Sequence, residues 1–467
     1  MPPRDFSCAI CIGATGWVRV LSAGHGDGGI LVGMSRKNRN LLIALGLFVT
    51  VYGVYRVVNH IRVQNRIAAI RAAGEPTTIE ELANWPVAIP DGQPNAADLY
   101  AEALALYVQP ADEKLPILRR GDMPELGQRF DPATREALTE ALADNTQALA
   151  LYRQAVTIPH CRFAYDYSEL PFYSNDGVHA VFQGKRLIQV IAALAFEDGD
   201  TAAGLDAVQM LLKMAAATSG HPDGMTFIVT LGCRSAAVNT LEVALNLNPF
   251  DDHQLQRCAA AISPIDAPDA LANVAIGERC VAVIFHDYVR HHNTMLVAGR
   301  EVPIWFWRLA GLNDLYAVGA LDYMNAHLAA VRRPYAERSF ALRELADESL
   351  KGFISFYFVF EGNYAHWNDL ELNWFAERSA CLASMAIERY RLAHGTLPDS
   401  LDALVPTYLE AVPADPFAEA PMRYVKREVG YVVYSVGRNE VDDGGSREVS
   451  RYPRHGGPLD IVFEVRR

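Results

Sequence analysis

The longest hydrophobic segment of the chain runs from Leu41 to Val58 and is interrupted only by Thr50 and Arg56. A transmembrane helix needs about 20 apolar residues, with a range of roughly 17 to 25, so this segment is long enough to cross a bilayer. No small-residue cleavage site follows it, which favours a retained anchor over a removed signal peptide. We therefore expect residues 41–58 to contact the membrane; a buried helix of a soluble protein is the alternative.

Positive residues lie on both sides of this segment, so their count does not decide which side of the membrane the remainder occupies. The residues preceding Met34 are rich in glycine and lack periodicity, whereas Met34 is followed by a charged stretch. We expect 1–33 to be a disordered leader or a mis-assigned start, and 34–61 to be the anchor. The flanking basic residues are Arg36, Lys37 and Arg39 before the segment, and Arg56, Arg62, Arg66 and Arg71 after it.

Residues 62–372 have apolar positions spaced three and four apart, which is typical of amphipathic helices. No fixed repeat period is present, so the pattern predicts an irregular, repeat-like helical domain. Capping residues or glycine mark several helix starts and junctions. These are Thr78 with Glu81, Asn95, Asp131 with Pro132, Gly199 with Asp200, and the aspartates before His253. One helix is expected over 131–156, and a continuing series of helices from about 179 to 350.

Residues 373–467 combine a helix with short alternating strands, so this part of the chain is predicted to be α+β. The helix is expected to end at Gly395, and a second, short helix to follow Ser400. Alternation on both sides of Gly430 predicts a hairpin, and "LDIVFEV" predicts a last strand. The predicted fold class is thus mainly α, with a transmembrane helix, a helical body and a small α+β domain.

The formal net charge is -13, and the body of the chain has no basic stripe interleaved with aromatic residues. Binding to nucleic-acid phosphates needs clustered Lys and Arg, so a general nucleic-acid-binding function is excluded. The cysteines are odd in number and irregularly spaced, which predicts no disulfide framework. Cys8 and Cys11 form an isolated CxxC without the second ligand pair of a zinc site. The other five are expected to be buried.

A polar helix in the body, "GERCVAVIFHDYVRHHN", contains the strongest candidates for catalysis. A metal site of the HExxH type needs two ligands at i and i+4, a spacing that His286 and His291 do not have. One hypothesis is a metal-assisted hydrolase that uses Glu278 and His286. The alternative is a helix with a polar face, whose C-terminal dipole is met by His291 and His292.

An aromatic stretch, "FISFYFVFEGNYAHWNDLELNWF", precedes the α+β part. Aromatic residues are enriched in the centres of interfaces, and they also dominate packed cores. Both a docking surface and a core that joins the two parts of the chain remain open interpretations.

Several markers occur in a fixed order through the C-terminal part. Over roughly the last 90 residues they resemble the globular head of the major pseudopilin of type II secretion systems. The whole chain also resembles large membrane-anchored proteins of planctomycete-like bacteria that carry such a tail. The processing site of pseudopilins is absent before Leu41, so the resemblance implies a head domain rather than a pilin subunit. The markers are Ala386 to Arg391, His394-Gly395, Leu397-Pro398, Leu401, Leu404-Val405, Pro413, Asp415 to Phe417, Arg423-Tyr424, Gly430-Tyr431 and Tyr434 to Gly437.

The resemblance implies a calcium ion in the loop that follows the second strand. The matching positions are Asn439, Asp442 and Asp443, together with Asp460 before the last strand. Calcium prefers six to eight oxygen ligands from carboxylates, amides and carbonyls, which these side chains and their backbone can supply. An ordinary exposed turn is the alternative interpretation of "DDGG".

The apolar segment predicts a single-pass protein of the inner (cytoplasmic) membrane, and the resemblance to the pseudopilin head implies that its large C-terminal part is extracytoplasmic. We expect an interaction or structural role, alongside secretion or pilus-like machinery and with a protein partner, for a chain with a calcium-binding head. The alternatives are the hydrolase described above and a helical-repeat scaffold with an inert tail.

Overall fold

The computed structural model describes residues 35–86, 89–119, 123–165, 176–264, 269–297, 300–349, 364–418, 420–447 and 460–467. These residues are mainly helical, with a small amount of sheet. The chain forms two compact units, Met1–His60 and Ile61–Arg467. The expected leader, with Cys8 and Cys11, lies outside the described residues, as does 350–363 of the aromatic stretch.

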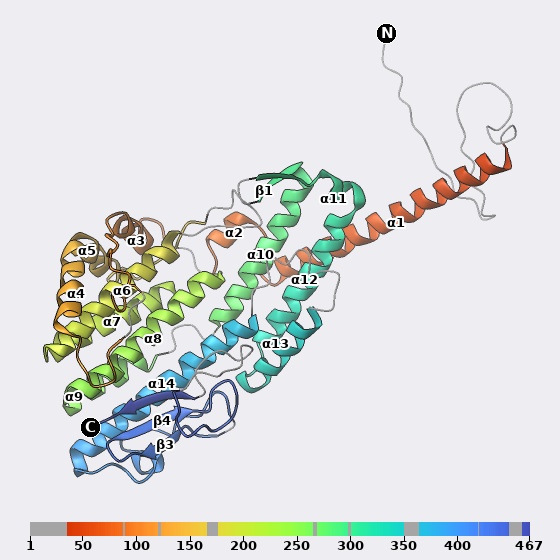
Figure 1. Ribbon diagram of the computed structural model, residues 1–467. Coiled ribbons are helices and arrows are strands. Elements are labelled where there is room, and N and C mark those ends of the chain that lie inside the picture. The colour runs from red at the N-terminus through yellow and green to blue at the C-terminus, as the bar shows by residue number, and fades with distance from the viewer. Residues whose placement is uncertain are drawn as a thin grey trace. The chain divides into compact units, whose positions relative to one another are not determined.

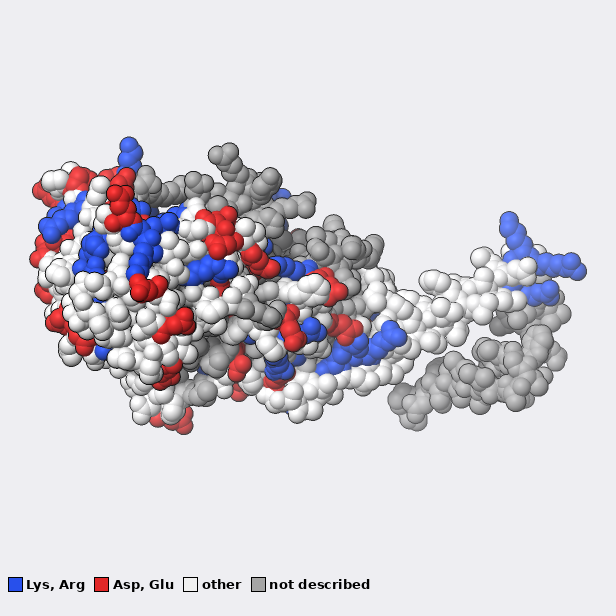
Figure 2. Space-filling model, turned by 90° about the horizontal axis from the view of Figure 1, so that it is seen from below, with Lys and Arg blue, Asp and Glu red and all other residues white. Residues whose placement is uncertain are grey.

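The predicted anchor belongs to α1, a single helix from Arg36 to Ala72. Its aliphatic side chains and Phe48 are exposed from Leu41 to Val58, with Phe48 67% exposed, while Tyr52 and Tyr55 are half-buried. Figure 2 shows the charged side chains at the start of this helix, followed by a stretch without charge. By length and composition α1 can cross a membrane. Among the described residues, one further helix is comparably long and apolar, α8 (Gly224–Leu247), but it is 72% buried over its most apolar stretch and is a core helix.

Consecutive helices of the second unit pack against one another, so that α6, α7 and α8 form one group, and α10 and α12 form another (Figure 1). The last turns of α1 pack on α10 and α12 through Val63, Ile67 and Ile70. The other helices are α2 Ile79–Ala83, α3 Ala96–Ala105, α4 Pro132–Asp144, α5 Thr146–Ala155, α6 Asp176–Glu197, α7 Thr201–Thr218, α9 Asp252–Ile262, α10 Ala270–His291, α11 Trp305–Ala310, α12 Leu312–Val331, α13 Tyr335–Ser349 and α14 Tyr364–His394.

Side-chain hydrogen bonds at the N-caps confirm the predicted helix starts. The side chains of Asn95, Asp131 and Asp200 accept backbone N–H bonds at the starts of α3, α4 and α7. A complete capping box forms at Asp251 with Gln254. At α2 only half of the expected box forms, because the carboxylate of Glu81 bonds Thr77 rather than the backbone of Thr78.

Two expectations for the helical part are wrong. The helix predicted over 131–156 is divided at Asn145, because this buried amide bonds both the N–H and the carbonyl of Val108. The helices expected through 179–350 are interrupted by an antiparallel hairpin, β1 (Thr294–Val297) and β2 (Arg300–Pro303). Strands this short contain too few residues for their alternation to be recognised against the helical pattern on either side.

The C-terminal sheet has the antiparallel order β3-β4-β5, formed by Arg423–Lys426, Tyr431–Ser435 and Ile461–Val465. The predicted hairpin and last strand are therefore confirmed. Gly430 has a φ of +77°, and a Cβ there would lie 1.7 Å from the carbonyl oxygen of Val465. Only glycine fits this turn. The short helix expected after Ser400 is a 3-10 helix, Leu401–Leu404.

One long helix, α14, joins the helical part to the sheet. It packs on α8, α9 and α13, and also on β4, β5 and the 3-10 helix. The boundary expected between residues 372 and 373 falls inside it, and its predicted end before Gly395 is confirmed. Tyr431 of β4 is fully buried and donates its hydroxyl hydrogen to the carbonyl of Ser384, 3.2 Å away.

The free edge of β5 is closed by side chains of α8. Asn246 donates to the carbonyl of Glu464 at 2.8 Å and accepts from the N–H of Arg466 at 2.7 Å. Glu242 accepts from the N–H of Glu464 at 2.6 Å. An uncovered strand edge presents unpaired backbone groups that favour aggregation, so these contacts satisfy the edge within the chain.

We predict that Asn246→Ala lowers the free energy of unfolding by about 1 to 3 kcal/mol, because the carbonyl of Glu464 and the N–H of Arg466 lose their partners. Chemical denaturation of the purified protein would measure this. Asn239→Ala is the matched control on the same helix: Asn239 is exposed and makes no hydrogen bond to another described residue. Its effect should stay within about 0.5 kcal/mol, and equal effects of the two substitutions would contradict the prediction.

We predict a second, pH-dependent effect at the interface of α8 and α14. Burial raises the pKa of Glu377 to about 7, opposed by a hydrogen bond from Ser235. In the unfolded chain a glutamate has a pKa near 4.3. Between these values the folded state binds more protons than the unfolded state, so stability falls as pH rises from about 4.5 to about 7.

Glu377→Gln should remove this dependence and stabilise the protein by about 1 to 3 kcal/mol at pH 8. Thermal denaturation across pH 4.5–8 would measure it. Glu140→Gln, at an exposed position of α4, is the control. An unchanged pH profile in the Glu377 variant would show that this carboxyl is not the group that titrates.

Candidate functional site

The four predicted calcium ligands lie around the loop that follows β4. The Nδ2 of Asn439 donates to Oδ2 of Asp443 at 2.8 Å, and the backbone N–H of Asp443 faces Oδ1 of Asp460 at 3.4 Å. The structure thus brings these three residues together. The loop is closed further by a bond from the N–H of Val441 to Oδ1 of Asn439.

The carboxylate of Asp442 is engaged with residues of the sheet. Tyr434 donates to Oδ1 and Arg423 to Oδ2, each at 3.0 Å. The N–H of Gly444 also bonds Oδ1, and this bond, with Tyr434 and Arg423, lowers the pKa of Asp442. The side chain therefore ties the loop to β3 and β4.

Asp460 has a different role, because its carboxylate is buried and acts as a cap for the loop backbone. The N–H groups of Gly445 and Ser446 bond Oδ2 at 2.7 and 3.1 Å. Burial raises the pKa of Asp460, while the three backbone N–H bonds oppose that shift. The carboxylate is satisfied by the protein itself.

These contacts bear on the fit of a calcium ion. An ion bound by all four side chains would have to displace Arg423 and Tyr434 from Asp442, and backbone donors from Asp460. In the part of the chain that the structure describes, no three His, Cys, Asp or Glu residues are grouped as a metal site. The donors as they lie do not form an oxygen cage of the kind that calcium prefers. Calcium binding at this loop stays an untested implication of the resemblance, and the contacts of Asp442 and Asp460 argue against it.

Asp415 organises the same region, a role that the sequence analysis did not assign to it. Its buried carboxylate accepts from the hydroxyl of Ser435 at 2.6 Å and from the N–H groups of Phe417 and Val436 at 2.9 and 3.0 Å. Arg423 lies 3.3 Å away and bridges Asp415 to Asp442. The only signal in the sequence was its place in the Asp-Pro-Phe turn.

The candidate catalytic pair, Glu278 and His286, lies on α10. Both residues are buried, but they are separated by about 12 Å along the helix, at 1.5 Å per residue. The Nε2 of His286 is 2.8 Å from Oδ1 of Asp314, which joins α10 to α12. The two candidates therefore do not meet in one site. His291 and His292 are exposed at the end of α10, and each Nδ1 donates to the carbonyl four residues earlier, as the polar-helix alternative expects.

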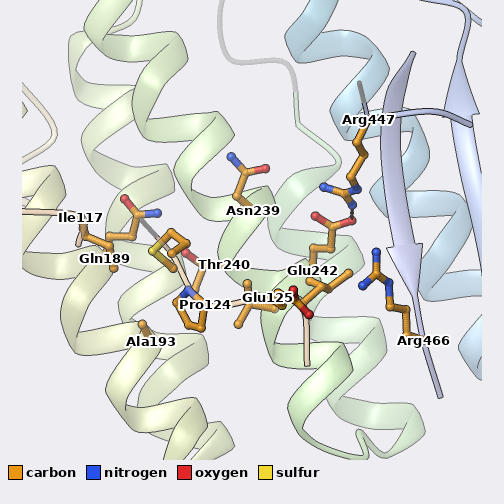
Figure 3. Close-up of a pocket in the computed structure, with 13 residues that line it drawn as sticks. Ile117, Pro124, Glu125, Gln189, Ala193, Asn239, Thr240, Glu242, Arg447 and Arg466 are labelled. Atoms are coloured by element: carbon orange, nitrogen blue, oxygen red, sulfur yellow. Dashed lines mark hydrogen bonds and ion pairs between the residues drawn. The ribbon is translucent and has the colours of Figure 1, made fainter. Parts of the chain in front are cut away.

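A cavity of about 640 Å³ lies between the loop before α4, the helices α6 and α8, and the C-terminal strand (Figure 3). It was not anticipated from the sequence, because its lining residues are far apart in the chain. The one signal was Glu242, the only acidic residue in the apolar helix α8. The lining consists of Ile117, Met123, Pro124, Glu125, Leu126, Gln189, Ala193, Asn239, Thr240, Glu242, Val243, Arg447 and Arg466.

The polar groups of this cavity are amides and ion pairs. Glu242 pairs with Arg447, and burial raises its pKa against that pairing (Figure 3). The amides of Gln189 and Asn239 make no hydrogen bond to another described residue, so they are available to a ligand. Among the described residues, the lining includes no His, Cys or Ser, the residue types that most often act as base or nucleophile. The arrangement suits binding of a polar molecule better than acid–base chemistry.

The contacts around Asp442 and Asp460 generate a prediction for the loop. We expect the melting temperature of the full-length protein in detergent to be the same in millimolar calcium and in excess chelator, because protein donors already satisfy these carboxylates. Asp460→Asn should lower the melting temperature in both conditions by weakening the cap on the loop backbone. A rise in calcium that disappears in an Asp442→Ala/Asp443→Ala variant would contradict this expectation and establish the calcium site.

In the comparisons with known proteins, no family model matches the chain, and neither a curated protein nor a solved structure matches it.

Proposed function

We propose that this chain is a membrane-anchored protein that holds a helical body and a C-terminal α+β region at a membrane surface for interaction with a protein partner. The observation that carries the proposal is the exposure of the apolar side chains of α1 between Leu41 and Val58. Exposing so much apolar surface to water is unfavourable, because each Å² of exposed apolar surface costs about 25 cal/mol of free energy. A bilayer removes that cost.

The way in which the chain enters the second unit supports the proposal. The second unit begins at Ile61, which is the third residue after Val58. Val63 is fully buried, and the guanidinium of Arg66 makes two 2.6 Å bonds to the carboxylate of Asp322. From Ile61 onward, α1 is therefore held to the rest of the second unit by buried apolar side chains and paired charges.

An extracytoplasmic location and a role alongside secretion or pilus-like machinery rest on the resemblance of residues 373–467 to a pseudopilin head. Ties between this region and the body support a fixed platform rather than a mobile head. They include Asp252 of α9, which pairs with Arg389 at 2.7 Å, and Asp369, which pairs with Arg438 at 2.8 Å.

A second candidate function is the binding of a small polar ligand in the cavity of Figure 3. The observation that favours it is the pair of unbonded amides of Gln189 and Asn239 in a space of about 640 Å³, which is within the usual range for ligand pockets. A hydrolase that uses Glu278 and His286 has no comparable support.

We predict that the expressed full-length protein stays in the membrane pellet after an alkaline carbonate wash. Leu47→Arg combined with Val51→Arg should release most of it, because each arginine near the middle of a span costs about 2.5 to 3.5 kcal/mol on insertion scales. Quantitative immunoblotting of pellet and supernatant would measure the partition.

The matched control places two arginines at exposed apolar positions of the body, Phe340→Arg and Leu392→Arg, which should not change the partition. Full extraction of the unaltered protein would overturn the anchor. Protease added to intact spheroplasts tests the orientation: degradation of the body is expected, and full protection would place it on the cytoplasmic side.

A further inference from the structure

A compact group of apolar side chains is exposed where the hairpin leads through α11 into α12. We call it the α11 patch. Leu309 is 67% exposed and Trp305 52% exposed, although both belong to well-formed helix. Exposed apolar groups of this kind, rich in aromatic residues, mark contacts with a partner or a membrane. Its members are Val302, Trp305, Phe306, Leu309, Leu312 and Leu315.

The patch is held in a fixed shape by adjacent residues whose side chains are buried on the opposite side of α11. Ile304 and Trp307 are buried, so α11 is anchored on one side and presents the other side outward. Arg308 donates to the carbonyl of Arg290 at 2.7 Å and bonds the side chain of Asn293, which ties α11 to the end of α10. The exposure is therefore a property of the packed structure.

The patch lies at the end of the second unit where the chain enters it. Arg66 pairs with Asp322, and Glu75 pairs with Arg332, so the last turns of α1 run parallel to α12. From the Arg66–Asp322 pair toward the N-terminus of each helix, Ile61 lies about 7 Å away along α1 and Leu315 about 10 Å away along α12. The two residues are therefore at the same end of the unit. Figure 1 shows α11 at this end of the α10 and α12 pair.

The charges at this end differ from those of the chain as a whole. Four arginines lie here, Arg62, Arg290, Arg300 and Arg308, against three carboxylates, in a chain whose formal net charge is -13. The carboxylates are Asp287, Glu301 and Asp314, and Asp314 is buried against His286. Basic side chains around an aromatic and aliphatic face suit a bilayer that contains anionic lipid.

We propose that the α11 patch inserts into the headgroup and upper acyl region of the membrane that α1 spans, so that the body is docked on the bilayer rather than only tethered to it. This inference rests on the proposed anchor, because the end of the unit that bears Ile61 faces the membrane only if residues 41–58 span it. Tryptophan and phenylalanine are favoured at this depth, because an aromatic ring tolerates the mixed polar and apolar surroundings. The docked surface fixes the orientation of the cavity and of the C-terminal sheet relative to the membrane.

The experiment uses full-length protein reconstituted into vesicles of phosphatidylcholine and anionic phosphatidylglycerol, with or without bromine on the upper acyl carbons. Brominated lipid quenches tryptophan that lies in the bilayer. The component of the emission lost in Trp305→Phe should be strongly quenched. Trp85→Phe is the matched control, because Trp85 lies near α2, away from the patch, and its component should be insensitive to the brominated lipid.

Leu309→Glu combined with Leu312→Glu should lift the patch out of the lipid and abolish most of the quenching of Trp305. Phe340→Glu, which is exposed on α13 outside the patch, should leave it unchanged. Flotation of each variant with the vesicles after an alkaline wash reports on the anchor separately. Flotation without quenching of Trp305 overturns the docking and leaves the anchor intact.

Protein that fails to float overturns the anchor, and the docking with it. Trp305 that is shielded from aqueous acrylamide but not quenched by brominated lipid would mean that a second copy or another protein covers the patch, which also overturns the proposal.

Discussion

The attachment of the edge strand β5 to α8 is the interaction on which the C-terminal part of the structure depends. A three-stranded sheet of short strands has little core of its own, and its edge would leave backbone groups unpaired. Asn246 and Glu242 bond the backbone of residues 464 and 466, and α14 covers the sheet face while also packing on α8 and α9. The sheet is thereby stabilised by the helical part, and residues 61–467 form one compact unit.

This dependence gives the polar residues of the region a consistent explanation. The buried carboxylates of Glu242 and Asp415 accept hydrogen bonds from backbone N–H groups, arginines or hydroxyls. Within the described residues, the carboxylate of Asp460 accepts only from backbone N–H groups. A buried carboxylate that lost such donors would be strongly destabilising, so these residues act in maintaining the fold. The acidic loop that suggested a calcium site uses the same kind of contact.

The proposed docking on the membrane depends on the end of the second unit that bears Ile61. The turns of α1 at residues 61–72 are held by apolar contacts to α10 and α12 and by the paired charges of Arg66 and Asp322. The exposed side chains of the α11 patch lie at that end, whereas the buried side chains of Ile304 and Trp307 attach α11 to the core. The docking surface and the sheet both belong to the compact unit Ile61–Arg467, whose orientation the bilayer would then set.

Local patterns in the sequence were enough to predict the apolar helix, the helix starts at Asn95, Asp131 and Asp200, the hairpin at Gly430 and the last strand. Each depends on residues within a few positions of one another, through periodicity, side-chain caps or a positive φ. Packing between distant segments decides that Asn145 ends a helix by bonding Val108, that α14 packs on two parts of the chain, and that Asp442 faces Arg423. It also decides which residues line the cavity and which form the α11 patch. These outcomes depend on contacts between distant segments, which local pattern does not contain, so a carboxylate suited to a metal can be satisfied instead by an arginine that folding brings beside it.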